Sequence, residues 1–146
     1  MPTAAKIISA VAMALVGLWA AVAYIPQLQT TSVGYFREMM AALGFVVGWR
    51  SLGRNSGRGY SESLGVGLRG SFLVVFWALL GFATYTMIVR STKRVYSGDP
   101  GKALLDVPQI MLQYGKLLLA QEVIVALVVG GVVAGLVAEF AARRWN

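Results

Sequence analysis

Long apolar blocks separated by short polar segments run the length of this chain of 146 residues. The first block, at 7–25, has no charged residue, and as a helix it would cover about 28 Å, close to the thickness of a hydrocarbon core. Further blocks predict spans at 36–52, 64–89 and 117–140. The pattern therefore predicts an all-α membrane protein with four transmembrane helices in a single domain, 1–146.

Two of these spans leave an alternative open. The first is also typical of a signal peptide, because the AVA triplet at 21–23 supplies an A-x-A cleavage site; we expect a retained helix. The uncharged part of the second runs only over 39–49, so this segment could instead be re-entrant. It reaches spanning length only if Arg37 and Glu38 lie on its first turn, with Arg37 snorkelling to the interface.

A different pattern precedes the last span, at about 102–116. Polar residues recur at helical spacing on one face of this segment, and apolar residues recur on the other, namely Leu104, Val107, Met111, Tyr114 and Leu118. Such an amphipathic helix suits the membrane interface or a neighbouring span. Asp106 can cap a helix that tolerates Pro108 in its first turn, so we expect the last helix to begin near Val107 and to project beyond the bilayer.

Small residues at helical spacing predict close contacts between helices. Gly44 and Gly48 form a GxxxG pair in the second span, and Gly131 and Gly135 form another in the last. In a bilayer, such pairs let two helix backbones approach each other closely. They are compatible with packing inside the molecule, with a homo-oligomer or with a membrane-protein partner.

The residue types exclude most catalytic and metal chemistry. The chain contains no Cys and no His, which removes disulfides, thiol redox chemistry, thiolate or imidazole metal sites and His-based acid catalysis. No nucleophile–base pair or carboxylate dyad stands at a usable spacing. We therefore expect a protein that is not an enzyme and that needs no cofactor and no metal.

The segment between the second and third spans concentrates Arg50, Arg54 and Arg58 among glycines. The net charge of +7 would suggest nucleic acid as the partner of a soluble protein, but in a membrane protein cations gather near anionic headgroups. We therefore expect membrane lipids, and no nucleic acid, as partners. The arginines have two interpretations: an anchor on lipid phosphates, or a site for a small oxyanion built from guanidiniums and glycine N–H groups.

Two nucleotide motifs can be read in the same segment, and neither fits. Gly65, Gly67 and Gly70 match GxGxxG, but no strand precedes them and an arginine stands where the ribose-binding acid belongs. The stretch at 48–55 imitates a P-loop, but it has Arg in place of Lys and Asn in place of the magnesium-binding hydroxyl. Either Ser61 or Ser63 is expected instead to cap the third span.

Two acidic residues lie in the last predicted span. Glu139 and Arg143 are four residues apart, in the orientation that favours an ion pair on a helix, and we interpret this pair as structural. Glu122 is the better candidate for an intramembrane functional acid, because ionisable groups in a bilayer usually face a partner or a water-filled path.

The distribution of Lys and Arg sets the expected topology. With both termini inside, seven basic residues face the cytoplasm and six face outward, which is a small difference. The short segments between spans decide, because the arginines at 50–58 have one nearby acid, whereas Arg37 is balanced by Glu38. Arg143 and Arg144 also follow the last span directly. We therefore expect both termini in the cytoplasm.

Several stretches resemble one known family. The opening MPTAAK, the GWR at 48–50 before the GRG turn at 57–59, the VFW at 75–77 and the closing GGVVAGLVAEFAARRW are similar to the TrgA-type tellurium-resistance membrane proteins of bacteria. The likeness runs from end to end, although 24–37 contributes little. It implies a small, multi-pass bacterial inner-membrane protein associated with tellurite resistance, and it implies no mechanism.

Three functions therefore stay open. The resemblance favours a resistance-associated membrane protein, which without Cys or His cannot reduce tellurite through thiols and must act indirectly or by binding or passing the oxyanion. An accessory or scaffold subunit of a larger membrane complex would explain the GxxxG pairs and the amphipathic segment. The third is an oligomeric anion channel or transporter lined by Glu122.

Overall fold

The computed structural model describes residues 4–27, 34–55, 57–93 and 98–145, so the opening 1–3 of the resemblance lies outside the described residues. The described residues form helices and no strands, which confirms the all-α class. In chain order the elements are α1 (Ala4–Tyr24), the 3-10 turn η1 (Ile25–Gln27), α2 (Phe36–Val47), the π-turn η2 (Gly48–Leu52), α3 (Gly53–Asn55), α4 (Tyr60–Thr92), α5 (Pro100–Leu117) and α6 (Gln121–Trp145).

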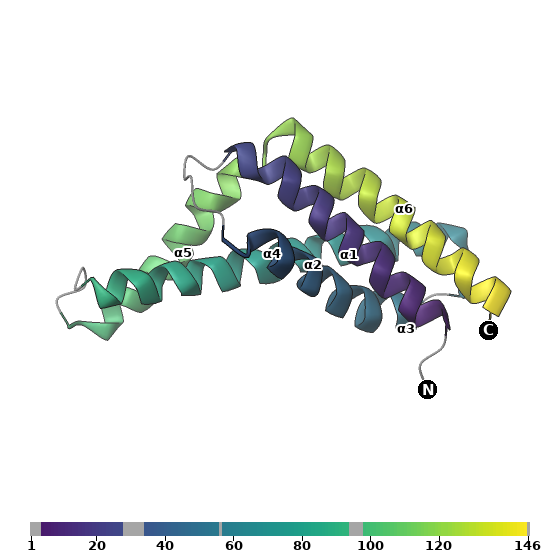
Figure 1. Ribbon diagram of the computed structural model, residues 1–146, viewed down its shortest axis with the longest axis horizontal. Helices are drawn as coiled ribbons and strands as arrows, with labels where there is room; N and C mark the ends of the chain where they lie inside the picture. Colours follow the sequence, from purple (N-terminus) through teal and green to yellow (C-terminus); the bar gives the residue numbers. More distant parts are fainter. Residues whose placement is uncertain (1–3, 28–33, 56, 94–97, 146) are drawn as a thin grey trace.

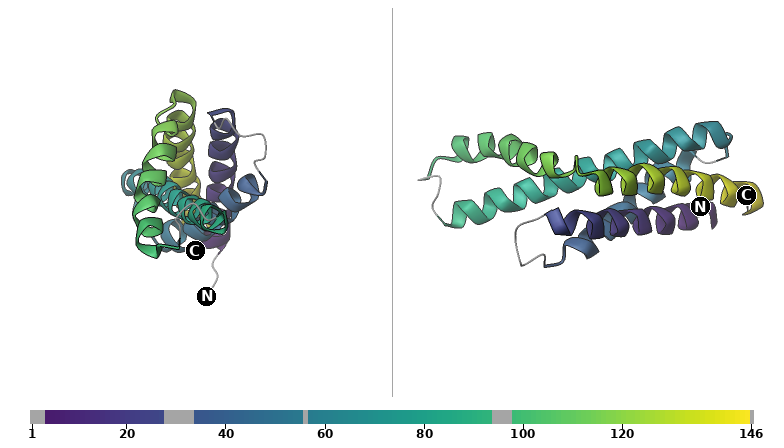
Figure 2. Two further views of the ribbon diagram at one scale, coloured as in Figure 1. Left: turned by 90° about the vertical axis from the view of Figure 1, so that its left-hand side faces the viewer. Right: turned by 90° about the horizontal axis from the view of Figure 1, so that it is seen from above.

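The helices α1, α2, α4 and α6 form a bundle from which a long hairpin projects (Figure 1). Within the bundle, α1 packs chiefly against α2 and α6, and α4 packs against α6. Figure 2 shows α5 running back beside the distal part of α4, beyond the ends of α1 and α2. The start of α1, the short helix α3 and the end of α6 lie together at one end of the molecule, opposite the tip of the α4–α5 hairpin.

Three helical segments of the described chain are long and apolar enough to cross a membrane, namely Ala4–Gln27, Tyr60–Thr92 and Gln121–Trp145. This agrees with a multi-pass membrane protein. The span predicted at 36–52 is helical, but it is divided between α2 and the π-turn η2. The 12 residues of α2 would cover about 18 Å, which is too short to cross a hydrocarbon core alone.

Glycines allow the bundle helices to touch backbone to backbone. Gly44 and Gly48 lie against the backbone of α1, and Gly131 and Gly135 lie against the backbone of α4. A Cβ atom added to Gly131 would stand 3.0 Å from the carbonyl oxygen of Gly67 and closer still to a neighbouring hydroxyl. Both GxxxG pairs therefore pack inside the molecule, because a side chain at these positions would push the helices apart.

The prediction that the last helix begins near Val107 is wrong. The chain turns after Leu117, and α6 begins at Gln121. Asp99, and not Asp106, caps α5, since its Oδ1 accepts a hydrogen bond of 3.0 Å from the N–H of Gly101. The carboxylate of Asp106 is used elsewhere: it accepts a 2.8 Å hydrogen bond from Arg90 and so ties α5 to α4.

The predicted apolar stripe of α5 packs in part. Val107, Met111, Tyr114 and Leu118 are half-buried, and the last two line a cavity against the bundle. Ala103 and Ile110 are buried, while Leu104 is 68% exposed. The ring of Tyr114 also meets Phe82 of α4, with the ring centres 5.8 Å apart. The larger leucines of α5 are left on the outer surface of the hairpin.

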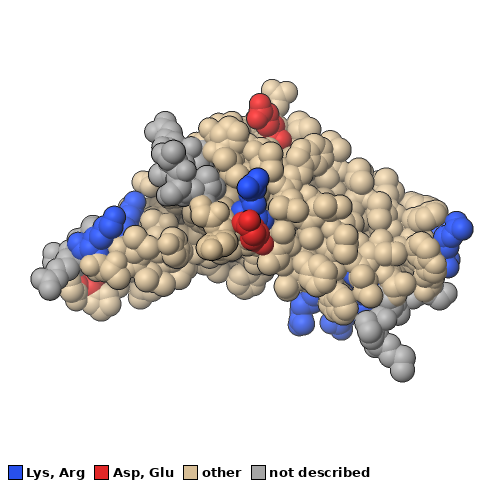
Figure 3. All heavy atoms as spheres, in the orientation of Figure 1, with Lys and Arg blue, Asp and Glu red and all other residues tan. Residues whose placement is uncertain are grey.

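Large apolar side chains are exposed along the bundle. Phe72 and Tyr85 on α4, Leu15 on α1 and Phe140 on α6 are all more than half exposed. On the face drawn in Figure 3, charged side chains form only small groups separated by wide uncharged areas. Such a surface is unfavourable in water and suits contact with acyl chains.

Candidate functional site

A groove of about 640 Å³ runs between the α2–η2–α3 segment and the first half of α4. None of the acidic residues that the structure describes lines it. Its walls combine arginines, small polar residues and apolar residues, which are Arg50, Arg54, Arg69, Ser51, Asn55, Leu43, Val46, Val47, Leu73 and Trp77. The groove therefore joins a cationic region to an apolar one.

Helical spacing separates the two regions along the groove. On α4, Arg69, Leu73 and Trp77 follow one another at intervals of four and so lie on one face. The helices α2 and α4 run in opposite directions (Figure 1). Trp77 accordingly shares a second cavity with Leu43 and Val46 of α2, which marks the apolar end of the groove.

The π-turn η2 shapes the cationic end of the groove. It contains Arg50, and glycines at both of its ends, Gly48 and Gly53, pack on α1. A Cβ atom at Gly53 would lie 2.8 Å from the Cγ of Lys6. This close approach fixes the turn against α1 and leaves the side chains of Arg50 and Arg54 on the exposed side. Single π-turns within helices are frequent at functional sites.

The cationic end has no internal counter-charge. The side chains of Arg50, Arg54 and Arg69 are exposed, and none of them makes an ion pair or hydrogen bond with another described residue. Figure 3 shows basic side chains gathered on the underside of the molecule, beneath α2 and α3. Positive charges held close together without a carboxylate attract anions from the surroundings.

Arg58 does not belong to this groove. It lies in the turn between Gly57 and Gly59, whose φ angles are 95° and 124°, and its side chain is exposed. The predicted set of Arg50, Arg54 and Arg58 is therefore divided: the first two line the groove together with Arg69, which the sequence did not single out.

A buried carboxylate holds the turn that contains Arg58. Glu139 has no exposed surface, and its Oε2 accepts hydrogen bonds from the N–H of Gly57 at 2.6 Å and from the hydroxyl of Ser63 at 2.9 Å. Its Oε1 accepts from the N–H of Gly59 and from Nε of Arg143, both at 3.0 Å. The predicted Glu139–Arg143 pair is thus present, and the same carboxylate also binds a loop about 80 residues away.

The surroundings of this carboxylate explain why the turn is well defined. The guanidinium of Arg143 lies 4.5 Å from the centre of the Tyr60 ring, in cation–π geometry. Ser63, expected to cap α4, uses its hydroxyl on Glu139 instead, and α4 begins after Gly59 with no side-chain cap. The start of α4 is therefore fixed by the end of α6.

Glu122 lies in the first turn of α6, and its side chain is exposed. An acidic residue is favourable at this end of a helix, where the backbone N–H groups are unpaired. No described residue forms an ion pair with Glu122. The structure thus puts this candidate acid at the junction of α5 and α6, far along the chain from the arginine groove.

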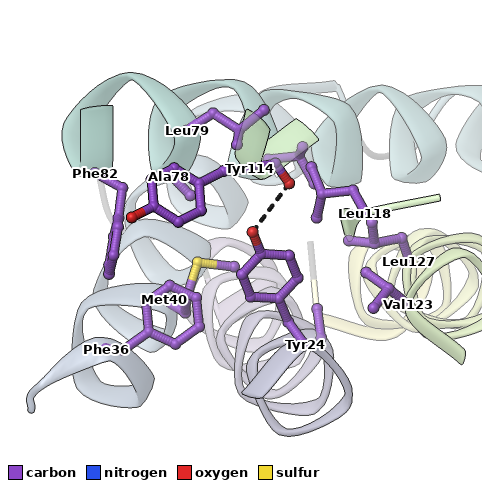
Figure 4. Close-up of a pocket in the computed structure, with 12 residues that line it drawn as sticks. Tyr24, Phe36, Met40, Ala78, Leu79, Phe82, Tyr114, Leu118, Val123 and Leu127 are labelled. Atoms are coloured by element: carbon purple, nitrogen blue, oxygen red, sulfur yellow. Dashed lines mark hydrogen bonds between the residues drawn. The ribbon is translucent and has the colours of Figure 1, made fainter. Parts of the chain in front are cut away.

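A third cavity, where α1, α2, α4, α5 and α6 meet, is too small for a ligand (Figure 4). Its free space is about 30 Å³, roughly the volume of one water molecule. The hydroxyl of Tyr24 donates a 3.0 Å hydrogen bond to the carbonyl of Tyr114, and the rings of Phe36 and Phe82 meet edge to face at 5.0 Å. These contacts make the region a packing core that joins α5 to the bundle.

Neither metal-binding residues nor similarity to known proteins points to a different kind of functional site. In the part of the chain that the structure describes, no three acidic side chains come close enough together to hold a metal ion. No protein-family model, no curated protein and no solved structure matches this chain. The groove lined by Arg50, Arg54 and Arg69 is accordingly the feature on which a function can be argued.

Proposed function

We propose that this chain is a non-enzymatic, multi-pass membrane protein that binds oxyanions in the groove lined by Arg50, Arg54 and Arg69. The observation that carries the proposal is the gathering of these guanidiniums around one groove without a carboxylate among its lining residues. A guanidinium presents paired N–H donors that match the oxygens of an oxyanion, and it keeps its charge at any physiological pH.

Tellurite resistance is the physiological role in this proposal, and it comes from the resemblance to TrgA-type proteins. Tellurite, like phosphate, presents negatively charged oxygens to a guanidinium. The chain has neither thiol nor imidazole, so its contribution is to hold or pass the oxyanion and not to reduce it.

A location in the bacterial inner membrane, with the groove and both termini on the cytoplasmic side, is part of the same proposal. The short helix α3, beside the groove arginines, lies at the end of the molecule where α1 starts and α6 ends (Figure 1). Arg143 and Arg144 lie in the last turn of α6. The positive-inside rule favours the cytoplasm for such a collection of cations.

Growth of a deletion strain over a series of tellurite concentrations tests this function. The strain is complemented with the wild-type gene, with the triple variant Arg50→Gln, Arg54→Gln, Arg69→Gln, or with Arg58→Gln as the matched control. We expect the wild type and the control to restore tolerance, because the groove is intact in both. The triple variant should be as sensitive as the deletion, although membrane levels of the protein stay equal by immunoblot.

Full tolerance with the triple variant would overturn the role of the groove. No sensitivity of the deletion strain itself would overturn the tellurite role.

A second candidate function, an accessory subunit of a larger membrane complex, is favoured by the outer surface of α5. Leu104, Leu105, Leu112 and Leu119 are each about 70% exposed in and just after this helix. A partner helix could bury them. Solubilisation in a mild detergent should then yield the protein in a high-mass assembly that Leu105→Glu dissociates, whereas a monomer of unchanged size would contradict this function.

A further inference from the structure

We infer that the groove binds an anionic phospholipid, with the phosphate between Arg50, Arg54 and Arg69 and one acyl chain along the apolar wall. The inference rests on the proposed function, because both require the arginines to bind an oxyanion. It adds the chemical class of the molecule that carries this oxyanion.

The first argument is that the groove has two chemically different ends. Arg69 and Trp77 are separated by about 12 Å along α4, so a small oxyanion between the arginines cannot also touch the apolar end. Leu43, Val46 and Leu73 complete that apolar end without any polar side chain. A molecule with a charged head and a hydrocarbon tail uses both ends, whereas free phosphate or tellurite uses one.

The second argument is the length of the apolar wall. Beyond Trp77 the wall continues into a cavity of about 340 Å³ that reaches Gly81 and Phe82. From Arg69 to Phe82 the distance along α4 is about 20 Å, while one leaflet of the hydrocarbon core is about 15 Å thick. The wall is therefore long enough for a complete acyl chain beneath a headgroup held at the arginines.

The third argument is the sign of the charge. The groove presents Arg50, Arg54 and Arg69 and no acid, so a ligand with net negative charge is attracted along its whole approach. A zwitterionic lipid such as phosphatidylcholine would bring its own ammonium group to the same guanidiniums. The groove accordingly favours a lipid such as phosphatidylglycerol, whose headgroup has no positive charge.

Native mass spectrometry of the full-length protein in detergent tests this inference. The protein is titrated with phosphatidylglycerol, with phosphatidylcholine or with inorganic phosphate, and the bound species are counted. The variants are the Arg50→Gln, Arg54→Gln, Arg69→Gln triple for the cationic end and Trp77→Ala for the apolar end. Arg58→Gln and Phe72→Ala are the matched controls, since both side chains are exposed and lie outside the groove.

We expect phosphatidylglycerol to bind about tenfold or more tightly than phosphatidylcholine, because the ammonium group of phosphatidylcholine is repelled by the guanidiniums that hold its phosphate. The arginine triple should abolish this preference and the binding of inorganic phosphate. Trp77→Ala should weaken the binding of both phospholipids and leave the binding of inorganic phosphate unchanged, because inorganic phosphate does not reach Trp77. Circular dichroism and the unfolding midpoint verify that each variant is folded; should the triple unfold, Arg54→Gln alone replaces it.

Three results would overturn the inference. Binding of inorganic phosphate without a preference for phosphatidylglycerol would contradict the lipid and leave the proposed function standing. An equal loss of phosphatidylglycerol binding in the groove variants and in Arg58→Gln would show that the lipid is attracted to the basic surface in general and not to the groove. Absence of binding for every anion tested would remove the inference and the proposed function together.

Discussion

Replacing Glu139 with Gln should destabilise the protein, because this fully buried carboxylate accepts hydrogen bonds from four donors. One of its oxygens binds the N–H of Gly57 and the hydroxyl of Ser63, and the other binds the N–H of Gly59 and Nε of Arg143. The side-chain amide of Gln has the same shape but only one oxygen. Its NH₂ group cannot accept from the donors that face it.

The magnitude follows from this geometry. In either orientation of the amide, two donors lose their acceptor, and each buried donor without a partner costs about 1–3 kcal/mol. Gly57 and Arg143 are exposed at the surface, so water can replace part of what they lose. We therefore expect the free energy of unfolding to fall by about 2–3 kcal/mol, the lower part of the combined range.

Equilibrium unfolding of the purified protein in a mild detergent measures this loss. Glu122→Gln is the matched control, because Glu122 is exposed in the first turn of the same helix and makes no ion pair with a described residue. Its removal costs only the interaction with the helix dipole, about 0.3–1 kcal/mol. Limited trypsin digestion gives a second readout, since release of the 57–59 turn should speed cleavage after Arg58.

The result to look for against this argument is an equal free energy of unfolding for Glu139→Gln and Glu122→Gln, within about 0.5 kcal/mol, with unchanged cleavage after Arg58. That result would refute the argument that Glu139 fixes the turn.

Two further predictions concern the bundle. Gly67→Ala should destabilise the protein by about 1–3 kcal/mol in the same unfolding assay, because its Cβ would overlap the carbonyl of Gly131. Gly65 has open space around it, so Gly65→Ala should be neutral or should stabilise the protein by up to about 1 kcal/mol. Equal effects of the two variants would contradict the close approach of α4 and α6. Because the chain has no cysteine, Ser61→Cys and Thr92→Cys, at opposite ends of α4, can be labelled individually with a membrane-impermeant maleimide. We expect them to react from opposite sides of the membrane, and labelling from one side would exclude α4 as a span.

The sequence predicted the structure best where a local pattern of residues has a single structural explanation. Long apolar blocks predicted α1, α4 and α6, since a helix satisfies the backbone groups of a single segment in an apolar solvent. The spacing of Glu139 and Arg143 predicted their ion pair, because residues four apart share a helix face. Both patterns are local, and the structure contains them at the predicted positions.

The parts that the sequence did not predict depend on contacts between distant segments. Nothing within α4 indicates that Arg69 lines the same groove as Arg50. The sequence does show that Arg69 lies four residues before Leu73 and eight before Trp77, and this spacing predicts that the three side chains share one face of α4. Asp106 was predicted to cap a helix that starts near Val107, because the sequence does not reveal that Asp106 lies inside α5 and binds Arg90.

The bonds of Glu139 to the glycine turn were missed for the same reason. Every residue except proline has a backbone N–H group, so the residue pattern does not show which of these groups bind a side chain. The turn also lies about 80 residues away from Glu139 in the sequence. Arg58 was grouped with Arg50 and Arg54 by spacing alone. The break after Asn55, and the positive φ angles of Gly57 and Gly59, move it out of their helical register.

Equilibrium dialysis of the delipidated protein against tellurite, read as bound tellurium by elemental analysis, tests most directly that the groove is an oxyanion site. The account predicts saturable binding to the wild type and to Arg58→Gln, and loss of that binding when Arg50, Arg54 and Arg69 are all replaced by Gln. Binding that is absent from the wild type, or that persists in the triple variant, would contradict it.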